Sequence, residues 1–81
     1  SDLDGQGIVK LYPNPTTDEI VIELKNIDQK VLAEISDITG KIVFRQTLEV
    51  EGKNTINVSG LSKGVYHCTI EGFGTIEFVK N

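Results

Sequence analysis

Residues 19–25 read Glu-Ile-Val-Ile-Glu-Leu-Lys and carry the clearest periodicity in the chain. Ile20, Ile22 and Leu24 alternate with the charged residues at positions 19, 23 and 25, and Val21 is the one apolar exception. Successive side chains of a β-strand point to opposite faces, so this alternation separates an apolar row from a charged row. The stretch therefore predicts an antiparallel strand with one buried face and one face in water.

The same pattern returns on both sides of this stretch, in short segments separated by turn residues. Val31, Ala33 and Ile35 repeat the alternation over residues 31–37. The periodicity predicts seven strands, over residues 8–12, 19–25, 31–37, 42–48, 55–58, 65–71 and 75–80. The predicted turns, rich in Gly, Pro, Asn and Ser, are residues 13–15, 51–54, 59–64 and 72–74.

Residues 37–41, Asp-Ile-Thr-Gly-Lys, predict a hairpin loop with a β-bulge. The Asp37 side chain can accept hydrogen bonds from its own backbone, and Gly40 is free to take a positive φ. We therefore expect the strand over residues 42–48 to return antiparallel to the strand before it.

The composition supports an all-β fold. Val, Ile and Thr make up 25 of the 81 residues, whereas Ala occurs once, at Ala33. β-Branched side chains lose rotamer freedom in a helix and pack well on a pleated surface, so helix is nearly excluded as a major element. Short strands about 8–12 residues apart, broken by Gly and Pro, indicate an antiparallel sandwich or barrel.

The composition also argues against catalysis and against binding of nucleic acid. The net charge is -4, and the basic residues are scattered singly, so the chain lacks the clustered positive charge that phosphate backbones require. The single His67 and the single Cys68 are adjacent, and in a strand their side chains point to opposite faces. We expect Cys68 to pack as a small hydrophobe. We predict that the chain is no enzyme, holds no cofactor or metal, and takes no small-molecule substrate.

Four motifs follow one another along the chain. They are Leu11-Tyr12-Pro13-Asn14-Pro15, then Asp37-Ile38-Thr39-Gly40-Lys41 of the predicted hairpin, then Leu61-Ser62-Lys63-Gly64-Val65-Tyr66, and finally Glu77-Phe78-Val79-Lys80. In this order and spacing they resemble the type A C-terminal sorting domain of proteins exported by the type IX (Por) secretion system. The resemblance covers residues 9–81 and implies an immunoglobulin-like sandwich of about seven strands.

The resemblance implies a sorting signal without catalysis of its own. Such a domain is the last part of a larger protein, is recognised in the periplasm by the outer-membrane translocon, and is removed at the cell surface by a sortase that joins the cargo to lipopolysaccharide. We expect residues 1–7 to be a linker from the upstream cargo and residues 8–81 to be the sorting domain. By position, the expected recognition residues are Tyr12, Pro13, Asn14, Pro15, Gly40, Lys41, Leu61, Gly64, Val65, Tyr66, Phe78, Val79 and Lys80. The expected cleavage region is Asp4, Gly5, Gln6 and Gly7, because a protease requires an extended backbone.

The last predicted strand suggests a mode of recognition. If this strand lies at a sheet edge, its unpaired backbone groups would receive a strand of the translocon, and Lys80 would protect the edge beforehand. An immunoglobulin-like module that binds protein or glycan is the alternative, since this fold hosts many functions, and Phe73 is then its one exposed ring. A structural spacer is a third interpretation.

Overall fold

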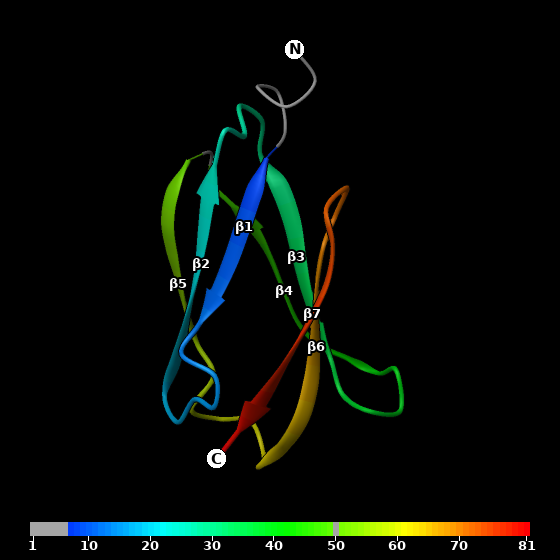
Figure 1. Cartoon of the computed structure of the whole chain (residues 1–81). Coiled ribbons are helices and arrows are strands. Elements are labelled where there is room, and N and C mark those ends of the chain that lie inside the picture. Colours follow the sequence, from blue (N-terminus) through cyan, green and yellow to red (C-terminus); the bar gives the residue numbers. More distant parts are fainter. Residues whose placement is uncertain (1–6, 50) are drawn as a thin grey trace.

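The computed structural model describes residues 7–49 and 51–81, and in these residues all regular structure is β-strand. Figure 1 shows the seven strands in chain order. They are β1 (Ile8–Tyr12), β2 (Glu19–Lys25), β3 (Val31–Ser36), β4 (Ile42–Leu48), β5 (Gly52–Asn57), β6 (Gly64–Ile70) and β7 (Gly74–Lys80). The predicted all-β class is confirmed.

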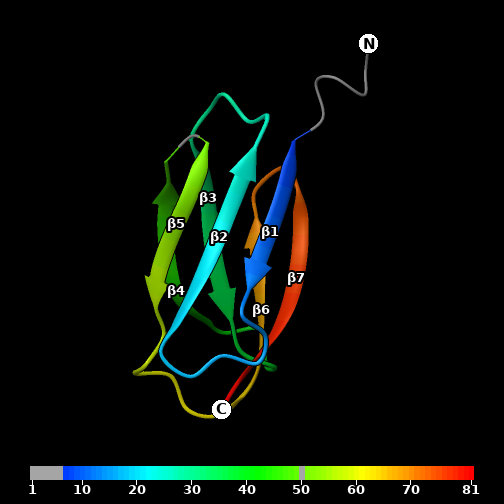
Figure 2. The ribbon, with the colours of Figure 1, turned by 60° about the vertical axis from the view of Figure 1, so that its left-hand side comes forward.

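The strands form two sheets that face each other. One sheet has the order β1-β2-β5 and the other the order β4-β3-β6-β7, and every pair of neighbours is antiparallel. Figure 2 shows the three-stranded sheet in front of the four-stranded one. This arrangement of three strands on four confirms the immunoglobulin-like sandwich over the open alternative of a barrel.

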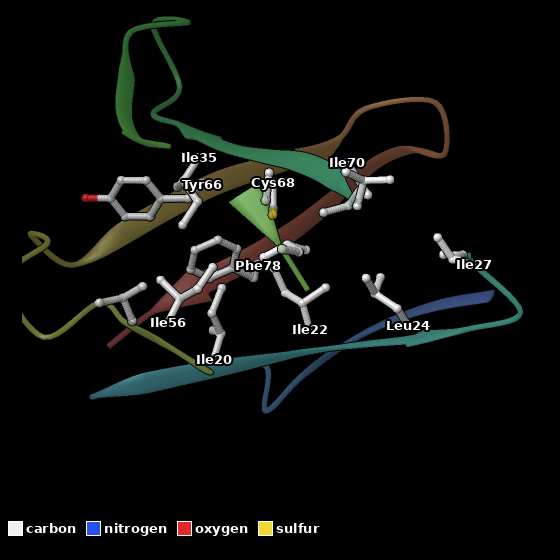
Figure 3. Packing of buried hydrophobic residues seen from close by; sticks show 14 residues of the cluster. Ile20, Ile22, Leu24, Ile27, Ile35, Ile56, Tyr66, Cys68, Ile70 and Phe78 are labelled. Atoms are coloured by element: carbon white, nitrogen blue, oxygen red, sulfur yellow. The ribbon is translucent and has the colours of Figure 1, made fainter. Parts of the chain in front are cut away.

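The core lies between the two sheets and follows the alternation of the sequence. Ile20, Ile22 and Leu24 of β2 are buried, as the periodicity of residues 19–25 predicts. Figure 3 shows these side chains pointing toward those of the four-stranded sheet, among them Ile70 and the ring of Phe78. Each of these aliphatic and aromatic groups contributes about 1.5–3 kcal/mol on leaving water, so this shared layer is the main source of stability.

The bulged hairpin is also confirmed. Between β3 and β4 the register shifts after Ile35, and Gly40 has a φ of +91°. The Asp37 side chain accepts hydrogen bonds from the backbone N–H groups of Thr39 and Lys41. The Asp-Ile-Thr-Gly-Lys stretch therefore forms its loop with local interactions alone.

The prediction was wrong about the start of the fifth strand. Residues 52–54 were expected to lie in a turn, whereas β5 begins at Gly52. The reason is pairing with β2, in which Gly52 lies opposite Leu24 and Asn54 opposite Ile22. Hydrogen bonding to a central strand holds these residues extended and overrides their local preference for a turn.

Cys68 packs inside the sandwich, as expected. Its side chain is fully buried, and desolvation raises the pKa of the thiol to about 11. The folded state disfavours the thiolate, so burial of the neutral thiol contributes to the free energy of unfolding. This contribution is complete below pH 9.0, where the thiol of the unfolded chain is also neutral, and is lost as the pH rises toward 11. At neutral pH Cys68 behaves as an apolar group.

We predict that Ile22→Ala lowers the free energy of unfolding by about 2–5 kcal/mol, because it leaves a cavity in the centre of the shared layer. Urea unfolding followed by circular dichroism measures this value. Ile38→Ala is the control, since Ile38 is exposed in a loop and its truncation should change stability by about 0.5 kcal/mol or less. Equal losses in the two variants would contradict the assignment of the core.

We also predict that the Cys68 thiol is inert in the folded protein. With a pKa of about 11, about one thiol in a thousand is ionised at pH 8, and no surface of the side chain is exposed. A chromogenic disulfide reagent should therefore react with the chain in urea within minutes and with the native chain only at the rate of unfolding. Rapid reaction under native conditions would overturn the packing described for β6.

Candidate recognition site

The four sequence motifs lie at one end of the sandwich. Consecutive strands run in alternate directions, so the β1–β2, β3–β4 and β5–β6 loops share an end with the C-terminus, while Gly7 lies at the opposite end (Figures 1 and 2). Residues 12–15, 40–41 and 61–66 belong to these loops or to the strand ends beside them, and residues 78–80 end β7. We call this end of the molecule the motif end.

The Asn14 side chain is hydrogen-bonded to β7. Its Oδ1 accepts from the backbone N–H of Val79 at 2.9 Å, and its Nδ2 donates to the carbonyl oxygen of Glu77 at 3.2 Å. A carboxamide has the same donor and acceptor as a peptide group, so Asn14 takes the position that a neighbouring strand would take.

Thr16 continues this pairing two residues later. Its N–H donates to the carbonyl oxygen of Val79 at 2.9 Å, and its own carbonyl oxygen accepts from the N–H of Asn81 at 2.8 Å. The residue forms a parallel bridge with Lys80, and it is only 2% exposed. Asn14 and Thr16, which we call the latch, thus occupy four backbone groups on the side of β7 that faces away from β6.

The third and fourth motifs are joined through the pairing of β6 and β7. Val65 lies opposite Val79 and Tyr66 opposite Phe78, and the two rings stack with centroids 5.7 Å apart. The Tyr66 hydroxyl donates to the carbonyl oxygen of Ser62 at 2.7 Å, which ties the β5–β6 loop to the same strand. Figure 3 shows the stacked pair at one end of the core.

The remaining motif residues lie apart from this cluster. Tyr12 donates from its hydroxyl to Glu23 Oε1 at 3.1 Å, on the outer face of the three-stranded sheet. Gly40 and Lys41 belong to the hairpin loop, and within residues 7–49 and 51–81 no hydrogen bond or ion pair links that loop to the latch. The structure therefore joins the first, third and fourth motifs and leaves the second beside them at the same end.

β7 is an edge strand, which meets the condition set for strand pairing with the translocon, but the expectation for Lys80 was wrong. Lys80 is only 7% exposed, and its Nζ donates to the carbonyl oxygen of Asn81 at 3.0 Å. Along β7 the side chains of Phe78 and Lys80 point inward while that of Val79 points out, so Lys80 cannot cover the edge. The latch covers the β7 edge instead. Its hydrogen bonds join residues more than sixty positions apart, and sequence periodicity cannot reveal such a contact.

Of the expected cleavage region, Asp4, Gly5 and Gln6 lie outside the described residues. Gly7 is half-buried at the end opposite the motif end, against Ile27 and Phe73. A Cβ atom at Gly7 would lie 2.5 Å from Ile27 Cγ1 and 2.7 Å from Phe73 Cε1, so only glycine fits there without movement. The Phe73 ring, 39% exposed, thus lies over the start of β1.

The described part of the chain has no feature of an enclosed ligand site. It encloses no pocket, and it brings together no group of three or more His, Cys, Asp or Glu side chains that could hold a metal. It also has no helix long and apolar enough to cross a membrane.

We predict that Asn14→Ala opens the β7 edge. Loss of both hydrogen bonds should lower stability by about 1–3 kcal/mol and speed exchange of the Val79 amide about tenfold or more. Asn14→Asp should have an intermediate effect on this amide, since it keeps the acceptor for the Val79 N–H and loses the donor to Glu77. Hydrogen exchange measured by NMR gives both values, with Asn57→Ala in β5 as the control, and unchanged exchange at Val79 in Asn14→Ala would contradict the latch.

Comparisons with known proteins agree with the motifs and the geometry. No curated protein and no solved structure matches the chain. A protein-family model described as the secretion system C-terminal sorting domain matches residues 10–80, which includes all seven strands in whole or in part. The chain belongs to this family, the C-terminal sorting signals of the type IX secretion system.

Proposed function

We propose that the motif end is the surface through which the outer-membrane translocon of the type IX system recognises this domain in the periplasm. The observation that supports the proposal is the collection of all four motifs at one end of the sandwich (Figure 1). Packing alone does not require this, because the fold also has turns at its other end. The role needs binding and no catalysis by the domain itself.

The position of Gly7 supports the second part of the proposal, which concerns the cargo. A C-terminal sorting domain follows its cargo in the chain, so the cargo joins near Gly7, at the end opposite the motif end. A cargo attached there leaves the motif end open to the translocon. The translocon can thus bind the domain at the motif end while the cargo is attached at the opposite end.

We further propose that a cell-surface sortase cuts the chain within residues 4–7 and joins the cargo to lipopolysaccharide. A protease binds its substrate as an extended segment separated from the fold. Gly7 packs against Ile27 and Phe73, which favours a scissile bond on the N-terminal side of Gly7. The domain is then released as a folded unit that begins at β1.

The proposal predicts that residues 1–81 export a fused reporter in a host with the type IX system, and that deletion of residues 75–81 abolishes export. Because this deletion removes the buried Phe78, a folded variant is needed as well. Val65→Thr with Val79→Thr keeps the shape of two outward-facing residues at the motif end and should reduce export about tenfold.

Ile8→Thr, at the end opposite the motif end, is the matched control and should leave export unchanged. Immunoblots of cell-surface and periplasmic fractions measure export, and the shortened product measures cleavage. Equal export by the full domain and by the folded motif-end variant would refute recognition at this end.

A further inference from the structure

The hairpin loop at residues 37–41 is unusually well held for a solvent-exposed turn. Asp37 Oδ1 accepts from the Thr39 N–H at 2.9 Å, from Thr39 Oγ1 at 2.6 Å and from the Lys41 N–H at 3.1 Å. Two backbone bonds close the same loop, from Asp37 N–H to the Lys41 carbonyl at 2.9 Å and from Gly40 N–H to the Asp37 carbonyl at 3.0 Å. The hydrogen bonds from Thr39 lower the pKa of Asp37, because they stabilise its charged carboxylate.

The ordered loop at residues 37–41 exposes an apolar side chain, that of Ile38, to water. Ile38 is 75% exposed, the highest value among the exposed large hydrophobic residues in the described part of the chain. Ile42 and Val43, at the start of β4, are exposed by 45% and 37%. A single exposed aliphatic residue is ordinary, but three within six residues, on an ordered loop and the start of the strand that follows it, mark an interaction surface.

The charges around these residues indicate the kind of partner. Arg45 is bound to Glu34, with 2.7 Å between Nη2 and Oε2. Lys41, between Ile38 and Ile42, is exposed and makes no ion pair with any residue in the described part of the chain. The surface thus offers branched aliphatic groups and one available cation, which an apolar socket with a carboxylate at its rim would complement.

Neither a glycan nor an anionic membrane offers an apolar socket with a carboxylate at its rim. Sugar-binding surfaces use aromatic rings, and residues 37–43 contain none. Binding to an anionic membrane requires several clustered cations, whereas this loop has one. A protein surface fits this chemistry better, and a loop that is already ordered by its own hydrogen bonds loses little entropy on association.

We propose that Ile38, Lys41, Ile42 and Val43 form a docking patch for a protein partner with an acidic-rimmed apolar socket, and that Asp37 is the positioning residue of this patch. The identity of the partner rests on the proposed function: it is the export machinery that recognises the motif end. The patch adds a contact separate from the latch. Ile38 and Lys41 lie within the second motif, whereas Ile42 and Val43 belong to none of the four.

The test is export of the reporter fusion carrying Ile38→Thr with Ile42→Thr. Threonine keeps the β-branched shape, so the melting temperature should stay within a few degrees, while export should fall about tenfold or more. Ile8→Thr is matched to Ile42→Thr, because Ile8 also begins a strand and is also 45% exposed, but at the other end. Unchanged export in the double variant overturns the patch.

Two further pairs test the charge and the scaffold. Lys41→Glu should reduce export, whereas Lys53→Glu, on the exposed side of β5, should not. Asp37→Ala should reduce export and speed amide exchange at Thr39 and Lys41, because it removes the acceptor that holds the loop. Normal export with a loosened loop would refute the positioning role.

A photo-crosslinking residue at position 38 makes the patch testable apart from export. It should crosslink to an outer-membrane component of the system in cells, and Lys41→Glu should abolish the product. Equal crosslinking from positions 38 and 8 refutes the patch. A fusion that crosslinks from position 38 but is not exported refutes the proposed function and keeps the patch.

Discussion

Burial of one shared layer of side chains between two sheets is the constraint on which the whole domain depends. A chain of 81 residues can bury only about 60–65% of its surface, so the inner faces of β2, β3, β6 and β7 must fill this layer almost wholly with apolar groups, and Lys80 at the end of β7 is the buried exception. The alternation around Ile22 and the ring of Phe78 meet this requirement. Seven antiparallel strands then place the loops at two ends, and one end collects the motifs.

The layer leaves β7 at an edge, where its backbone groups would be open to other chains. The latch solves this locally, because the Asn14 carboxamide and the Thr16 backbone supply the hydrogen bonds of a missing strand. The motif Tyr-Pro-Asn-Pro thereby has a structural role at the same strand that carries the last motif. Recognition surfaces at this end are built from residues that the fold also needs, while the docking patch around Ile38 has no role in the core.

Local chemistry made much of this predictable. The strands, the inward row of β2 and the hairpin around Gly40 follow from patterns within seven residues of one another. The start of β5 did not, because pairing of Gly52 with Leu24 overrides turn preference. The role of Lys80 was also missed, since its inward direction depends on where β7 lies against Thr16 and the core.

The sequence by itself determined the all-β class, the approximate strands, the bulged hairpin and the family, because periodicity, turn residues and ordered motifs are properties of neighbouring residues. Only the tertiary structure decided which motifs meet and what covers the β7 edge. These depend on contacts between distant parts of the chain, such as Asn14 with Val79, and a linear pattern contains no record of them.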